Sequence, residues 1–114
     1  MKIVNKKRKL IIAEDAKFAK TFFQRFRGLM FSKPRNLVIV APKETIKHTS
    51  IHTCFMLFPL DVLWLNSDFE VVDGAKKTGN WRFFKPDKPA KYVVEIGIGS
   101  IGKTRIGDKI EFVE

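Results

Sequence analysis

The stretch LDVLWLNSDFEVVDGA, residues 60–75, decides the fold of this chain. Mainly apolar residues fill 61–66, an Asn-Ser-Asp turn signal follows at 66–68, and a second β-rich stretch runs over 69–75. Asn, Ser and Asp favour turns because their side chains bond neighbouring backbone groups. The pattern therefore predicts two strands joined as a β-hairpin.

Short strand patterns of the same kind recur on both sides of this hairpin. They predict further strands at 9–13, 36–41, 50–57, 81–84, 91–96 and 109–113. The strand–helix–strand pattern that indicates a parallel sheet is not seen. We therefore predict a mainly β (β-rich α+β) fold, a compact antiparallel sandwich or barrel of about seven short strands with one amphipathic helix packed against it.

The helix is predicted from phenylalanines that recur every four residues. Phe18, Phe22 and Phe26 would share one face of a helix. Asp15 is a suitable N-cap and Gly28 a suitable C-cap. A stripe of this kind indicates core packing rather than a ligand site.

The length and composition indicate a small globular protein. We expect 114 residues to form a single domain, 1–114, with a basic N-terminal region at 1–9 and a globular core at 10–114. A hydrophobic content of 45% excludes a disordered chain. The single cysteine excludes a disulfide framework and a thiolate zinc site.

The net charge of +10 is concentrated near the N-terminus. Residues 1–35 hold eleven of the 22 Lys and Arg residues, opposed only by Glu14 and Asp15. This asymmetry favours a polyanionic partner, and the aromatic-basic segment at 81–85 is typical of a platform on which bases stack. Nucleic-acid binding is therefore one hypothesis, through the residues Lys6, Lys7, Arg8, Lys9, Trp81 and Arg82. The alternative is that the basic run is a solvated turn that aids solubility.

No targeting or membrane segment is predicted. The apolar run at 10–13 is shorter than the core of a signal peptide, and the stretch at 54–65 is broken by Pro59 and Asp61. We expect a cytoplasmic protein with a reduced thiol, and a monomer. The single glutamine and single cysteine are compatible with a heat-adapted source.

Five segments together resemble a known family. They are RGLM at 27–30, HTCFM at 52–56, FPLDVLWL at 58–65, AKYVVE at 90–95 and IGDKI at 106–110. In this order and spacing they are similar to the archaeal and bacterial family of domain of unknown function 192, also called UPF0127. The resemblance spans about 11–112 and implies a compact, mostly β domain without an established activity. Many relatives differ at the positions of Cys54 and Leu57, so no polar role is transferred there.

A polar pocket is the main functional hypothesis. Asp61 lies between apolar residues, and a buried carboxylate needs a partner or a shifted pKa. Arg27 and His52, from the family-like segments, are candidate partners, and Glu95 could join Asp61 as a second carboxylate. We predict that these four side chains converge in a ligand pocket. The alternative for Asp61 is that it caps a turn by accepting backbone N–H groups.

Three other kinds of chemistry fit parts of this sequence, each beside a purely structural role. Asp61 with Glu95 is compatible with a carboxylate-based hydrolase. His52, Cys54 and Met56 alternate on one strand and would suit a soft metal, although core packing explains them better, and no metal or cofactor is predicted. The segment 97–104 matches the glycine-lysine-threonine phosphate loop of nucleotide-dependent enzymes. Residues 105–108 would break any helix within a turn, and the family resemblance implies a connector before the last strand, which is the interpretation we prefer.

Overall fold

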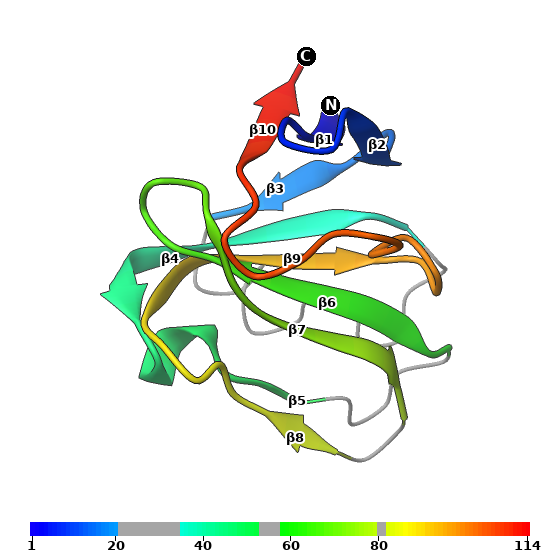
Figure 1. Ribbon diagram of the computed structural model, residues 1–114. Helices are drawn as coiled ribbons and strands as arrows, with labels where there is room; N and C mark the ends of the chain where they lie inside the picture. Colours follow the sequence, from blue (N-terminus) through cyan, green and yellow to red (C-terminus); the bar gives the residue numbers. More distant parts are fainter. Residues whose placement is uncertain (21–34, 53–57, 80–81) are drawn as a thin grey trace.

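The computed structural model describes residues 1–20, 35–52, 58–79 and 82–114 (Figure 1). A small sheet has the strand order β10-β1-β2 and consists of β1 (Lys2–Asn5), β2 (Leu10–Ala13) and β10 (Ile110–Val113). Both of its pairings are antiparallel, so the two ends of the chain lie side by side.

A larger sheet forms the centre of the molecule, in the order β3-β4-β9-β6-β7. Its strands are β3 (Lys17–Ala19), β4 (Leu37–Thr45), β6 (Leu60–Leu65), β7 (Val71–Thr78) and β9 (Ala90–Ile96). A short 3-10 turn, η1 (Lys47–Thr49), follows β4. Two short strands, β5 (Ile51–His52) and β8 (Phe83–Phe84), pair with each other below this sheet in Figure 1. The predicted mainly β class is confirmed.

The predicted hairpin is present as β6 and β7. The two strands pair antiparallel, and Asn66 forms the turn because its Oδ1 accepts the N–H groups of Asp68 and Glu70, each at 3.0 Å. The turn places Phe69 at a φ of 63°, which is rare for a bulky residue. Stacking of its ring on Tyr92, 4.9 Å between centroids, accompanies this conformation.

The two faces of the large sheet pack into separate core clusters. Leu63, Leu65 and Val94 face the small sheet and pack with residues such as Ile3. Residues of the opposite face pack toward β5 and β8, namely Leu37, Ile39, Val62, Trp64 and Val93. Since β6 is buried on both faces, its sequence is nearly continuously apolar rather than alternating.

The predicted helix is wrong over 17–19. These residues form β3, which pairs in parallel with β4 and is the exception to the antiparallel pairing of the other described strands. Asp15 adopts a φ of 54° rather than the extended geometry of an N-cap, and the ring of Phe18 packs edge-on against Phe112 at 5.7 Å. The remaining helix positions, Phe22, Phe26 and Gly28, lie outside the described residues.

The sequence pattern also missed the strand β1. Lysines at positions 2, 6 and 7 conceal its period, yet Ile3 is completely buried and Asn5 faces the interior with it. The basic N-terminal region therefore includes a central strand of the small sheet.

Candidate functional site

Glu95 is a buried acid on the middle strand of the large sheet. The pairing register places it beside Leu37 of β4 and Val62 of β6, and Val93 precedes it on the same face of β9. Only 5% of its surface is exposed, and its Oε2 atom has no hydrogen-bond partner among the described residues. Burial raises the pKa of Glu95 from 4.5 to about 7. This carboxyl can therefore exchange a proton near neutral pH.

Asp61 is also buried, but both of its carboxylate oxygens accept hydrogen bonds from backbone N–H groups. Its Oδ1 accepts the N–H of Lys77 at 2.9 Å, and its Oδ2 accepts the N–H groups of Gly99 at 2.9 Å and Ile101 at 3.3 Å. A bulge in β7 supports the first of these bonds, since the register shifts opposite Asp61 and Lys77 has a φ of 49°. Asp61 thus holds β6, β7 and the loop after β9 together, as in the capping alternative.

The predicted convergence of Asp61 and Glu95 in one pocket is wrong. Asp61 is paired with Ile96, whereas Glu95 is paired with Val62. Neighbouring residues of a strand point to opposite faces, so the two carboxylates lie on opposite sides of the sheet. Arg27 lies outside the described residues, and His52 is placed only as a backbone position of β5, opposite Phe83. Of the four predicted pocket residues, Glu95 is the one with a buried oxygen, Oε2, that has no hydrogen-bond partner among the described residues.

The basic run at the N-terminus forms the turn between β1 and β2. Lys6 makes an ion pair with Glu111 at 3.5 Å, and Arg8 makes one with Asp108 at 2.6 Å. Lys7 and Lys9 remain exposed.

The second half of the predicted nucleic-acid surface lies elsewhere. Arg82 lies over the ring of Phe84, 5.7 Å from its centroid, whereas Trp81 is outside the described residues. Figure 1 shows the turn between β1 and β2 at the top of the molecule and β8 at the bottom. The basic turn and the strand that follows Arg82 therefore lie apart in the fold.

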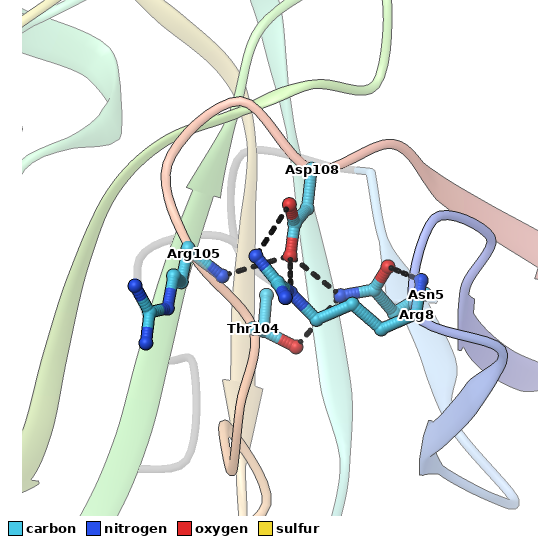
Figure 2. A network of polar contacts seen from close by, with 5 residues as sticks. All are labelled: Asn5, Arg8, Thr104, Arg105 and Asp108. Carbon is cyan, nitrogen blue, oxygen red and sulfur yellow. Dashed lines mark hydrogen bonds and ion pairs between the residues drawn. The ribbon is translucent and has the colours of Figure 1, made fainter.

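Sequence reasoning missed a polar network around Asp108 (Figure 2). This carboxylate, 1% exposed, accepts hydrogen bonds from Arg8 Nε at 2.6 Å, Asn5 Nδ2 at 3.0 Å and the Arg105 N–H at 2.9 Å. Asn5 also donates to Thr104 Oγ1 at 3.0 Å. Burial acts to raise the pKa of Asp108, but these bonds and the charge of Arg8 lower it to about 2. The network fastens the turn between β1 and β2 to the loop before β10.

The glycine-rich segment at 97–104 is a connector rather than a phosphate loop. No helix begins within the described stretch 97–109, and the N–H groups of Gly99 and Ile101 are directed at Asp61. A phosphate loop needs such N–H groups free at the start of a helix. The match of this segment to a phosphate loop is therefore a match of sequence alone.

The described part of the chain contains neither a cluster of metal-ligating side chains nor a membrane-spanning helix. Cys54 and Met56 lie outside it, and the residues inside it contain no group of three His, Cys, Asp or Glu side chains arranged to hold a metal. Among these residues no helix is long and apolar enough to cross a membrane.

Comparison with protein families gives one match over almost the whole chain. A sequence model of the DUF192 family, described as "Uncharacterized ACR, COG1430", matches residues 3–112. The chain is similar to UPF0127 proteins of three archaea. It is 42% identical to that of Thermococcus sibiricus, over 96% of this chain and 73% of the relative.

Two further relatives show the same similarity. The protein of Pyrococcus furiosus is 45% identical over 86% of each chain, and that of Pyrococcus horikoshii is 40% identical over 96% of this chain and 97% of its own. These relatives come from thermophilic archaea, in agreement with a heat-adapted source.

Two crystal structures share the fold. One is a protein of unknown function from Novosphingobium aromaticivorans, with a TM-score of 0.83 and 18% identity over 97% of this chain and 82% of its own. The other is described as a putative transcription regulator from Sinorhizobium meliloti, with a TM-score of 0.83 and 17% identity over 96% of this chain and 89% of its own. At these identities the likeness shows the fold alone.

Proposed function

We propose that this chain, which belongs to the DUF192 family, is a small cytoplasmic domain that binds a ligand through Glu95. The observation that carries this proposal is the buried Oε2 atom of Glu95, which has no hydrogen-bond partner among the described residues. A buried polar atom without a partner costs about 1–3 kcal/mol, and more when it is charged. Such groups are rare in native proteins, and a bound donor would remove the cost.

The surroundings of Glu95 define the class of ligand. Leu37, Val62 and Val93 line the sheet around the carboxyl and offer only apolar side chains. A matching ligand therefore combines an apolar body with an N–H donor. A charge-assisted bond to a carboxylate is stronger than a neutral one, so we propose an alkylammonium or alkylguanidinium group.

Binding of a cation has a measurable consequence for the proton on Glu95. A nearby positive charge favours the ionised carboxylate and lowers its pKa. The pKa of about 7 in the free protein means that the group is about half protonated at pH 7. Binding of a cation at that pH should therefore release about half a proton, whereas a neutral ligand should release none.

Calorimetry with n-butylammonium chloride tests the proposal. Titrations at pH 7 in two buffers with different ionisation enthalpies measure proton release, and 1-butanol serves as a neutral probe with the same apolar tail. We expect binding with proton release for wild type and for Glu111→Gln, in which an exposed carboxylate is changed in the same way. Loss of binding in a folded Glu95→Gln variant supports the proposal, whereas equal binding by this variant, or no binding by wild type, overturns it.

Nucleic-acid association is a second candidate, favoured by the exposure of Lys7 and Lys9, which form no ion pair within the described residues. Anisotropy of a labelled oligothymidylate at two salt concentrations measures it. On this alternative, the double variant Lys7→Glu/Lys9→Glu should weaken binding about tenfold, while Lys43→Glu/Lys47→Glu, also at exposed positions, should not. Absence of binding by wild type contradicts the alternative.

A further inference from the structure

The free edge of the small sheet is a strand without charged residues. β2 lies at the end of the order β10-β1-β2, and Figure 1 shows it on the outer side of this sheet. All four of its residues, Leu10–Ala13, are apolar. Proteins usually protect such edges with charges, prolines, bulges or very short strands, because an unpaired edge is a template for another strand.

The edges β7, β10 and β3 carry charges, and β5 and β8 have only two residues each. β7 has two register shifts and exposed Lys76 and Lys77, and β10 presents the exposed Glu111. β3 has only three residues and begins with Lys17. The pairing of β2 with β1 also has one register shift, between Ile3 and Val4. Among the described edge strands of three or more residues, however, β2 is the one without a charged residue.

The hydrogen-bond pattern of the small sheet shows which groups of β2 face this edge. Opposite residues of antiparallel strands alternate between pairs that exchange hydrogen bonds and pairs that do not. The Lys6 N–H donates to the Lys109 carbonyl, so Lys6 and Lys109 are a hydrogen-bonded pair. The next pair along the strands, Asn5 with Ile110, is therefore one that does not exchange hydrogen bonds. It follows that the N–H and C=O groups of Asn5 face β2, whereas those of Val4 face β10. Ile11 of β2 lies opposite Val4, so its own N–H and C=O groups face away from β1. No described group bonds them there, and the Ile11 side chain is 59% exposed.

Charges at the two ends of β2 indicate what fits this edge. Lys9 precedes the strand, and Glu14 and Asp15 follow it. A second β2 running antiparallel would place the basic end of one strand beside the acidic end of the other. If Ile11 of one copy pairs with Ile11 of the other, Lys9 of the first copy lies opposite Ala13 of the second and next to its Glu14. The edge is thus complementary to itself.

We propose that β2 pairs with β2 of a second copy of this chain, antiparallel and centred on Ile11. The two Ile11 residues exchange backbone hydrogen bonds, and the small sheets join into one of six strands across a two-fold axis. A four-residue pairing buries less than the ~1,200 Å² of a stable complex, so the dimer is weak, with a Kd on the order of 0.1 mM. This inference is independent of Glu95 and replaces the expected monomer at high protein concentration.

Sedimentation equilibrium from about 0.01 to about 1 mM protein tests the pairing. We expect wild type to dimerise across this range, and both Ile11→Pro, which removes the edge N–H, and Ile11→Lys to remain monomeric. Ile106→Lys makes the same exchange on a loop residue that is 68% exposed and should dimerise like wild type. Since Ile11 is exposed, Ile11→Lys keeps the test informative if the proline variant does not fold.

A charge exchange tests the orientation of the strands. Lys9→Glu alone and Glu14→Lys alone should each weaken the dimer severalfold, because like charges then meet across the edge. The double variant Lys9→Glu/Glu14→Lys should restore it. A wild type that stays monomeric at about 1 mM, or a dimer that Ile11→Lys leaves unchanged, overturns the proposal and assigns the edge to another occupant or to none.

Discussion

Arg8 and Asp108 lie one hundred residues apart in the sequence, and their side chains are joined by an ion pair of 2.6 Å between Nε and Oδ2. The contact connects the turn after the first strand to the loop before the last (Figure 2). The Arg8 side chain is about one-third exposed, whereas Asp108 is buried, so the carboxylate is the group that depends on the network. This bond therefore helps to close the small sheet against the remainder of the fold.

Removal of the Asp108 carboxylate should destabilise the protein strongly. Asp108→Ala leaves the Asn5 amide and the Arg105 N–H without their acceptor, and we expect the free energy of unfolding to fall by about 3 kcal/mol. Urea denaturation at pH 7 measures this loss. Asp68→Ala, at an exposed carboxylate in a turn, is the control and should change stability by less than about 0.5 kcal/mol. Equal stability of the two variants would show that the network contributes little.

The same carboxylate predicts a loss of stability in acid. The folded-state pKa of Asp108 is lowered from 3.8 to about 2, so the folded state binds this proton less readily than the unfolded state. Its contribution is fully present above about pH 4 and is lost as the pH falls toward 2. Wild type should therefore lose about 2 kcal/mol more than Asp108→Asn between pH 5 and pH 2, as measured by urea denaturation. Parallel pH profiles for the two proteins would contradict this origin.

Glu95 predicts the opposite dependence at higher pH. Its folded-state pKa of about 7 exceeds the ordinary value of 4.5, so the folded state holds the proton more tightly than the unfolded state. The contribution of Glu95 to the free energy of unfolding is therefore largest below about pH 4.5. It falls by about 3 kcal/mol as the pH rises past 7. Denaturation at pH 5 and pH 8 should show this decrease in wild type and a smaller one in Glu95→Gln. If both proteins lose the same stability, the decrease does not come from Glu95.

Asp61 should matter for stability but not for ligand binding. Asp61→Asn keeps the size of the side chain but replaces one acceptor oxygen, so one or more of the three backbone N–H bonds is lost. We expect a decrease of about 2 kcal/mol in the free energy of unfolding. Binding of n-butylammonium by the folded fraction should be unchanged, because Asp61 and Glu95 lie on opposite faces of the sheet. Loss of binding in this variant would restore the single-pocket hypothesis.

The hairpin of β6 and β7 could be predicted because its signals are local. The turn chemistry of Asn66 and the apolar run before it act within a few residues. The segment 17–19 could not be predicted in the same way. Its phenylalanine spacing fits a helix, but the pairing with β4, about twenty residues later, decides its conformation.

The candidate site depends on register, which the sequence does not encode locally. The sequence indicated that Asp61 is a buried acid, which it is, and that Glu95 could accompany it as a second carboxylate. Their relative placement depends on the pairing of β6 with β9, in which a shift of one residue moves a side chain to the other face. The Asp108 network was missed for a related reason, since its partners are one hundred residues apart.

The central claim is that Glu95 is an ionisable buried acid that receives a cationic ligand. The most direct measurement is the carbon-13 NMR titration of the Glu95 carboxyl, assigned by comparison with Glu95→Gln, without and with saturating n-butylammonium. We predict a pKa of about 7 in the free protein and a pKa lowered toward the ordinary range in the complex. A pKa near 4.5 in the free protein, or one that the ligand does not change, would contradict the claim.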